Sequence, residues 1–129
     1  MLTNGTVPKI VLVVEDEPAI VEVLKCHLDG EGLAVMVART GEDALEVAFQ
    51  ARLLVVLLDL GLPDIDGFEI LRRLKAAKPQ LPVIIVTGMK REEEARRAFD
   101  LGAWDYVTKP VDFSYLKNVL RLYSQQSAS

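Results

Sequence analysis

Polar side chains follow the short apolar runs of this sequence, at the points where the runs end. They are two acids after the first run, one acid after the third, a hydroxyl group at the end of the fourth and an amine after the fifth: Glu15, Asp16, Asp59, Thr87 and Lys109. Clustered carboxylates repel one another, and a hard divalent cation relieves that repulsion. A carboxylate beside such a cation can attack phosphorus and form an aspartyl phosphate. The residue types therefore predict phosphoryl transfer, with the lysine and the hydroxyl group binding phosphoryl oxygens.

The apolar runs themselves are short and rich in β-branched residues, at positions 10–14, 33–37, 53–58, 83–86 and 104–107. Strands that are covered on both faces have this composition, as in a parallel sheet. The stretches between them carry apolar residues at helical spacing, and the stretch 42–50 is the weakest helix. Alternating strands and helices predict an α/β fold with helices on both faces of a parallel sheet.

A sheet of this kind has its functional site at the carboxyl ends of the strands. If the strand order is 2-1-3-4-5, the first, third and fourth strands are adjacent. Their carboxyl ends then bring Glu15, Asp16 and Asp59 into one pocket.

Helix boundaries are indicated by capping residues. Thr40 and Asp66 each begin a pattern that resembles a capping box, and Asp112 is a candidate cap for the last helix. Gly30 and Gly102 stand where helices are expected to end.

The sequence has 129 residues, which predicts a single domain. We expect residues 1–8 to be a flexible lead, residues 9–123 to form the domain, and residues 124–129 to be a tail or the start of a linker. The net charge of −4 disfavours direct nucleic-acid binding, because phosphate backbones attract clustered lysine and arginine. No apolar run approaches the roughly 20 residues that span a bilayer, and the N-terminus does not resemble a signal peptide. We therefore expect a cytoplasmic protein that does not contact a membrane.

Four segments together resemble the signature segments of response-regulator receiver domains of two-component systems: VLVVEDEP, LLDLGLPDIDGFEILRRLK, PVIIVTG and GAWDYVTKPVD. The resemblance extends from about Lys9 to Tyr123. It implies a flavodoxin-like (βα)5 three-layer sandwich with strand order 2-1-3-4-5. It also implies that Asp59 accepts a phosphoryl group from a sensor histidine kinase or a phosphotransfer protein. Such a domain is not a conventional enzyme, since it catalyses only its own phosphorylation and dephosphorylation.

The same resemblance assigns roles to individual residues. Glu15, Asp16 and Asp59 would hold Mg²⁺ together with the backbone carbonyl of Gly61. Gly61 occupies a position where many relatives carry a larger side chain, which leaves the lifetime of the aspartyl phosphate open in either direction; Met89 is an alternative shield.

The resemblance also implies a switch. Thr87 and Lys109 would bind the phosphoryl group, and Tyr106 would be the switch aromatic whose ring moves inward as Thr87 closes on the phosphate. The Lys109–Pro110 peptide bond would be cis, which is rare enough to be meaningful. The surface made by the last two helices and the fifth strand is then expected to contact a partner, a second copy or an attached output domain. Candidate residues on or near it are Arg96, Arg97, Trp104, Asp105, Lys117 and Arg121.

Other interpretations are open for parts of this pattern. A receiver-like docking module that is not phosphorylated would have the same fold. An aspartate-nucleophile phosphatase of the haloacid dehalogenase type would need a second aspartate as general acid where Gly61 stands. Among the remaining polar residues, Glu17 is expected to begin the first helix, and Asp64 and Asp66 to serve as loop and cap residues. His27 and Trp104 are expected to be packing residues.

Overall fold

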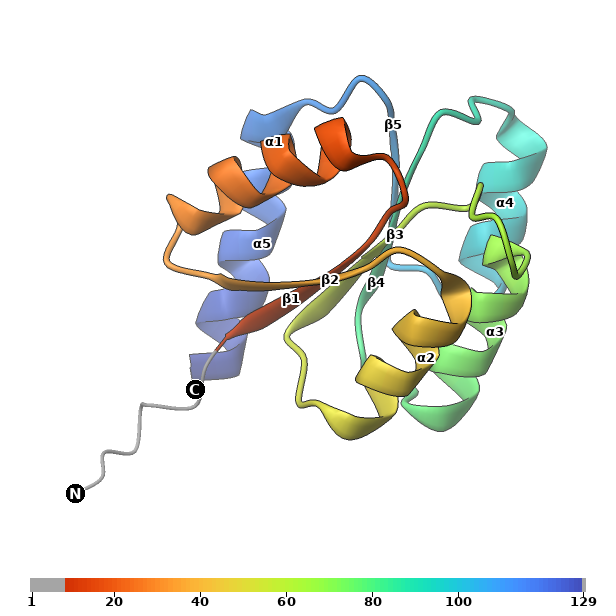
Figure 1. The fold of residues 1–129 in the computed structure, drawn as a ribbon, viewed down its shortest axis with the longest axis horizontal. Coiled ribbons are helices and arrows are strands. Elements are labelled where there is room, and N and C mark those ends of the chain that lie inside the picture. Colours follow the sequence, from red (N-terminus) through yellow and green to blue (C-terminus); the bar gives the residue numbers. More distant parts are fainter. Residues whose placement is uncertain (1–8, 129) are drawn as a thin grey trace.

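The computed structural model describes residues 9–128, and it describes side chains as far as Ser124. Five strands alternate with five helices (Figure 1): β1 (Ile10–Val14), α1 (Pro18–Asp29), β2 (Ala34–Ala38), α2 (Gly41–Gln50), β3 (Val55–Leu58), α3 (Gly67–Ala77), β4 (Val83–Thr87), α4 (Glu92–Asp100), β5 (Asp105–Thr108) and α5 (Phe113–Ala128).

The strands form one parallel sheet in the order β2-β1-β3-β4-β5. Helices α1 and α5 lie on one face of the sheet, and α2, α3 and α4 lie on the other (Figure 1). The predicted fold class, a flavodoxin-like three-layer sandwich with this strand order, is confirmed. Because the strand order reverses between β1 and β3, the loops that follow these two strands lie side by side at the carboxyl edge of the sheet.

Two apolar clusters hold the layers together. Alternate side chains of the central strands point to opposite faces, so Leu12 and Leu58 pack toward α2, α3 and α4, while Val13 and Leu57 pack toward α1 and α5. Every residue of β3 and β4 is buried. Burial on both faces explains why these strands are apolar throughout and carry polar side chains only at their ends.

The observed strands differ slightly from the predicted runs. β2 covers residues 34–38 rather than 33–37, and β3 begins at Val55 although the apolar run begins at residue 53. Leu54 is 8% exposed just before the strand and belongs to the cluster under α1 and α5, while Leu53 packs against the cluster under α2, α3 and α4. The apolar run therefore indicates where the chain becomes buried, and burial begins two residues before β3 starts to pair with β1 and β4.

The capping predictions are confirmed with one change of partner. Thr40 Oγ1 accepts a hydrogen bond from the Asp43 amide at 3.1 Å, and Asp112 Oδ1 accepts one from the Tyr115 amide at 3.1 Å. Asp66 also caps its helix, but its carboxylate accepts from the Phe68 amide. The Glu69 side chain, predicted to complete that capping box, pairs instead with two arginines of its own helix, Arg72 and Arg73.

At the chain ends, the predicted lead 1–8 lies outside the described residues. α5 continues through Ala128, although a tail was predicted from Ser124. Serine, glutamine and alanine are compatible with a helix, so polar composition alone did not locate its end. Gly30 caps the end of α1, and Gly102 follows α4 with a φ of 103°. No helix within residues 9–128 combines the length and the apolar character needed to cross a bilayer.

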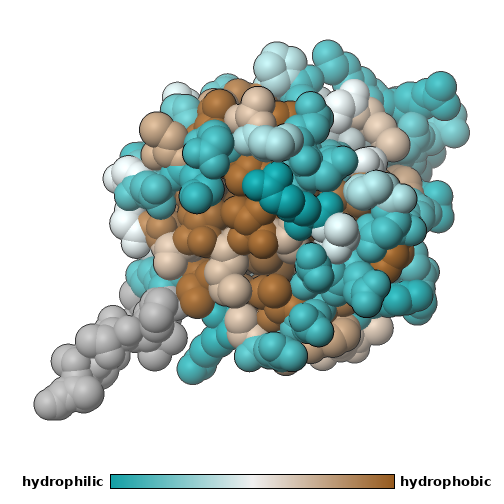
Figure 2. Space-filling view, viewed as in Figure 1, coloured by the Kyte–Doolittle hydropathy of each residue, from teal (hydrophilic) through white to brown (hydrophobic). Residues whose placement is uncertain are grey.

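β2 forms one edge of the sheet and carries no charged residue. Met36 in this strand is 37% exposed. Viewed from this side, apolar surface gathers in the middle of the molecule, over β2, and polar side chains surround it (Figure 2). This edge is therefore more apolar than the surface around it.

Gly67 begins α3 where that helix approaches the loop after β3. A Cβ atom added there would lie 2.4 Å from Leu60 Cα and 2.8 Å from its carbonyl oxygen, whereas one added at Gly88 would meet nothing within 4 Å. We expect Gly67→Ala to lower the free energy of unfolding by about 2 kcal/mol, because the backbone must move apart. Urea denaturation followed by circular dichroism measures this loss, with Gly88→Ala as the matched control. Equal stability of the two variants would contradict the close approach.

Candidate functional site

The carboxyl ends of four strands bring the predicted site residues to one edge of the sheet. Glu15 and Asp16 follow β1, Asp59 follows β3, Thr87 ends β4, and Lys109 follows β5. Backbone hydrogen bonds continue the ladders into these positions. The Asp59 amide donates to the Val14 carbonyl at 3.0 Å, and the Lys109 amide donates to the Thr87 carbonyl at 2.8 Å. The sheet therefore sets the spacing of the site.

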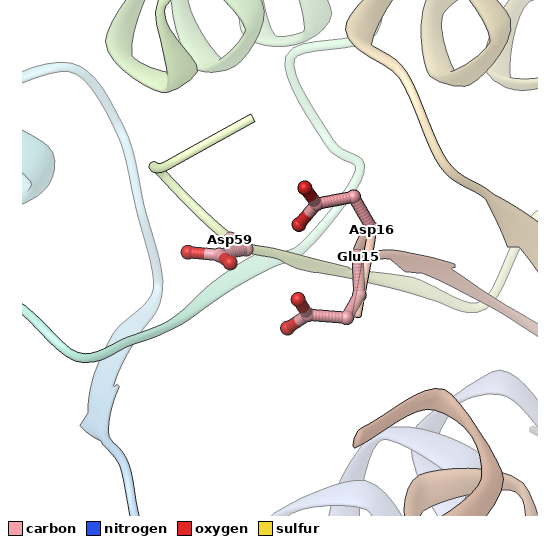
Figure 3. A group of neighbouring side chains, drawn as sticks. All are labelled: Glu15, Asp16 and Asp59. Carbon is pink, nitrogen blue, oxygen red and sulfur yellow. The ribbon is translucent and has the colours of Figure 1, made fainter. Parts of the chain in front are cut away.

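The three acids form a compact cluster. Glu15, Asp16 and Asp59 each offer one carboxylate oxygen, and these atoms all lie within 4.8 Å of one another. Their side chains point to the same side of the strand ends (Figure 3). Glu15 is 2% exposed and Asp59 is 7% exposed, while Asp16 is open to solvent. An all-oxygen donor set that is open on one side fits Mg²⁺, which keeps several waters when it binds to proteins.

Lys109 supplies the positive charge beside this cluster. Its Nζ atom lies 2.7 Å from Glu15 Oε1 and 3.2 Å from Asp59 Oδ2. Burial lowers the pKa of Lys109, but its hydrogen bond to Glu15 and the charge of Asp59 outweigh burial, so the pKa is raised and the amine stays charged. Burial raises the pKa of Glu15; the Lys109 hydrogen bond opposes this change, and the nearby Asp59 carboxylate adds to it. The pocket thus holds more negative charge than one lysine neutralises.

The loop after β3 leaves one side of Asp59 open. Asp59 Oδ1 accepts a hydrogen bond from the Gly61 amide at 3.1 Å. A Cβ atom added at Gly61 would lie 3.8 Å from Asp59 Oδ1 and would meet no other group within 4 Å. A larger side chain at position 61 would therefore stand directly beside the Asp59 carboxylate. The role of the Gly61 carbonyl as a metal ligand stays a prediction.

Thr87 and Tyr106 meet at the loop that follows β4. The Met89 amide donates to Thr87 Oγ1 at 3.4 Å, and the Tyr106 hydroxyl donates to the Met89 carbonyl at 2.8 Å. The ring of Tyr106 packs against the core that α2, α3 and α4 cover. Burial, followed by the charge of Glu94, raises the pKa of Tyr106, so its hydroxyl stays a donor. The Lys109–Pro110 bond that follows β5 is cis.

Several polar residues of the sequence lie outside the acid cluster. Asp64 accepts hydrogen bonds from the amides of Gly41 at 2.8 Å and Glu42 at 3.1 Å, so it caps α2 from the loop after β3. These amide bonds, with that of Gly41 the strongest, lower the pKa of Asp64 against a smaller opposing effect of burial. The sequence predicted a loop residue here but had no signal for its distant partner.

The packing interpretations of His27 and Trp104 are confirmed. His27 stacks on Phe113 with ring centroids 3.9 Å apart. Trp104 packs edge-on against Tyr123, with centroids 5.3 Å apart.

Two arginines expected on or near the output surface contact residues of neighbouring elements. The Arg97 guanidinium lies 4.2 Å from the centre of the Phe68 ring in α3. Arg121 forms two hydrogen bonds with Glu31, after α1, at 2.6 and 3.1 Å. Arg97 nevertheless lies in α4 and Arg121 in α5, so both remain on or near the surface made by α4, β5 and α5, and the use of that surface for output stays a prediction.

A parallel five-stranded sheet in this order, with an acid cluster and a lysine at its carboxyl edge, is the arrangement of a flavodoxin-like α/β domain. The family model for the response regulator receiver domain matches residues 11–121. The chain belongs to this family.

Individual relatives agree with this assignment. The chain is 37% identical over 119 residues to the uncharacterized transcriptional regulatory protein YkoG of Bacillus subtilis, covering 92% of this chain and 52% of YkoG. The structure of the BeF3-activated DrrB receiver domain matches with a TM-score of 0.84 and 32% identity, over 92% of this chain and 99% of that receiver-domain chain. The Mn(2+)-bound form of the response regulator Rcp1 matches with a TM-score of 0.77 and 26% identity, over 88% and 90% of the two chains. The chain spans about half the length of the curated relatives it matches.

The geometry separates Asp16, which belongs to the acid cluster, from Asp64, which caps a helix. We expect Asp16→Asn to weaken Mg²⁺ binding by about tenfold or more, because one charged oxygen donor becomes neutral. Isothermal titration with MgCl₂ measures this change. Asp64→Asn is the matched control and should leave the affinity for Mg²⁺ unchanged while lowering the urea midpoint. A weakening by Asp64→Asn equal to that of Asp16→Asn would contradict the assignment.

Proposed function

We propose that this receiver domain accepts a phosphoryl group on Asp59 from a phosphohistidine of a sensor histidine kinase or a phosphotransfer protein. One observation carries the proposal: the Asp59 carboxylate lies 3.2 Å from the ammonium group of Lys109 and clusters with the acids Glu15 and Asp16. Glu15, Asp16, Asp59 and the Gly61 carbonyl would hold Mg²⁺. Bound there, Mg²⁺ would neutralise charge on the phosphoryl oxygens.

The residues of the chain supply the other requirements of the reaction. An Asp59 oxygen attacks phosphorus in line, the phosphorus–nitrogen bond to the donor histidine breaks, and the histidine leaves with the electron pair of that bond. The ammonium group of Lys109, which bonds the carboxylates, turns to bond the incoming phosphoryl oxygens and stabilises their negative charge. The Thr87 hydroxyl, held by the Met89 amide, is the donor for a further oxygen. The reaction depends mainly on positioning and charge, which a rigid sheet edge provides.

The relatives support this proposal at the level of the family. Receiver domains of response regulators interact with histidine kinases or phosphotransfer proteins. DrrB was crystallised as a BeF3-activated domain, and Rcp1 was crystallised with Mn(2+). A fluoride complex and a divalent cation are chemically suited to the same kind of pocket as a phosphoryl group and Mg²⁺.

The output of the domain is proposed to pass through the surface made by α4, β5 and α5. Tyr106 of β5 bonds the loop between β4 and α4, so a movement of Thr87 toward a phosphoryl group would change the contacts of that loop. We propose that this surface contacts a partner, a second copy or an output domain, in the cytoplasm. YkoG and TcrX are transcriptional regulatory proteins about twice as long as this chain, so an output domain is part of the proposal only by similarity.

Competing functions have less support. An unphosphorylated docking module would not require Asp59, Thr87 and Lys109 together at one sheet edge. A phosphatase of the haloacid dehalogenase type needs an acid two residues after the nucleophile, and Gly61 has no side chain.

Phosphorylation can be tested directly with a small phosphodonor. We expect acetyl phosphate and Mg²⁺ to add a single phosphoryl group to the protein, as measured by intact mass. Asp59→Asn should abolish the adduct, because it removes the attacking carboxylate, and a chelator should abolish it in the wild type. A panel of sensor kinases provides a second donor. If no donor labels the wild type, the docking-module interpretation replaces this one, whereas steady release of phosphate from phosphomonoesters would indicate a phosphatase.

The open side of Asp59 predicts a short-lived aspartyl phosphate. We expect Gly61→Leu to slow the loss of the adduct by about threefold or more, because the added side chain would shield the acyl phosphate from attacking water. Decay of the adduct mass after removal of acetyl phosphate measures the rate. Gly61→Ala, which adds only the Cβ atom, should fall between Gly61→Leu and the wild type. Equal decay in all three proteins would show that the water approaches from another side.

A further inference from the structure

Asp105 at the start of β5 joins two parts of the molecule with its two carboxylate oxygens. Oδ1 accepts a hydrogen bond from the Tyr106 amide at 2.8 Å. Oδ2 accepts a short hydrogen bond from the hydroxyl of Tyr115. Tyr115 stands in the first turn of α5, where its own amide bonds the capping carboxylate of Asp112 at 3.1 Å. The start of β5 is therefore tied to the start of α5.

The same connection reaches the phosphoryl-binding end of the site. From Tyr106, the side-chain hydroxyl donates to the Met89 carbonyl at 2.8 Å. The Met89 amide then donates to Thr87 Oγ1 at 3.4 Å. A continuous line of hydrogen bonds thus runs from the buried hydroxyl of Thr87 through the loop after β4 to the surface of α5.

Tyr115 makes a contact that a hydrophobic side chain could not replace. It is 45% exposed, so little of its ring is used to fill the core. The hydrogen bond to Asp105 is the first cause of the raised pKa of Tyr115, which keeps the hydroxyl protonated and able to donate. Within residues 9–128, β5 is an edge strand that pairs with β4 on one side, so the side chain of Asp105 restrains the start of this strand from outside the ladder.

We propose that Tyr115 is a positioning residue for phosphorylation: through Asp105 it fixes Tyr106, and through Tyr106 it holds the loop that carries the Thr87 hydroxyl in place. This inference rests on the proposed phosphoacceptor function. In this proposal, the position of the Thr87 hydroxyl depends in part on a residue of α5 that contacts neither the proposed metal ligands nor the phosphoryl group.

The experiment compares the wild type with Tyr115→Phe. We measure the initial rate of phosphorylation by acetyl phosphate with Mg²⁺, and the affinity for beryllofluoride with Mg²⁺ by nuclear magnetic resonance. Tyr115→Phe removes one hydroxyl group, and we expect it to reduce both quantities by about fivefold, the size of the typical net contribution of one hydrogen bond. Tyr123→Phe is the matched control, because it deletes another phenolic hydroxyl from the same helix. The ring of Tyr123 packs on Trp104.

The same substitution made in a Tyr106→Phe protein separates a positioning role of Tyr115 from a general loss of stability. If the effect travels through the Tyr106 hydroxyl, Tyr115→Phe should cause no further loss in a Tyr106→Phe protein. The inference is overturned if Tyr115→Phe equals the Tyr123→Phe control, or if its full effect persists in the Tyr106→Phe background. A wild type that takes no phosphoryl group from any donor overturns the proposed function and this inference together. A phosphorylated wild type with an unaffected Tyr115→Phe variant overturns only the inference.

Discussion

The placement of one ammonium group between two buried carboxylates is the interaction on which this site depends. Glu15 and Asp59 are nearly inaccessible to water, and Lys109 bonds both of them. Two buried acids of like charge would be costly without such a partner. The lysine leaves the third acid, Asp16, uncompensated, so the pocket retains an attraction for further positive charge.

The sheet makes this arrangement possible because its central strands are buried on both faces. β3 and β4 can be apolar along their whole length, and the first polar residue after each apolar run falls at the carboxyl edge. Strand order then decides which of these residues meet. The order reverses between β1 and β3, and the acids that follow these two strands lie together at that point of the carboxyl edge.

Much of the fold, and the grouping of the polar residues that follow the strands, could be predicted from the sequence, since both follow from local patterns. Apolar runs located the strands to within two residues, and the polar residues at their ends located the pocket. Side-chain contacts between distant segments could not be predicted in this way. Asp64 bonds an amide 23 residues away and Arg121 bonds an acid 90 residues away, and neither pairing leaves a pattern in the sequence. The Tyr115–Asp105 bond is closer in sequence, but it depends on the angle between α5 and the edge strand.

The exposed edge of β2 has a consequence for how the chain tolerates change. The Ala34 amide bonds β1, so alternation along a parallel ladder turns the backbone groups of Val35 and Val37 outward. An apolar, uncharged edge with free backbone donors and acceptors is a template for pairing with another extended segment. The strand is only five residues long, which limits that pairing in the folded molecule, and α1 and α2 pack against its two faces (Figure 1). Substitutions that loosen α1 or α2 would therefore expose more of this apolar strand and favour self-association at high concentration.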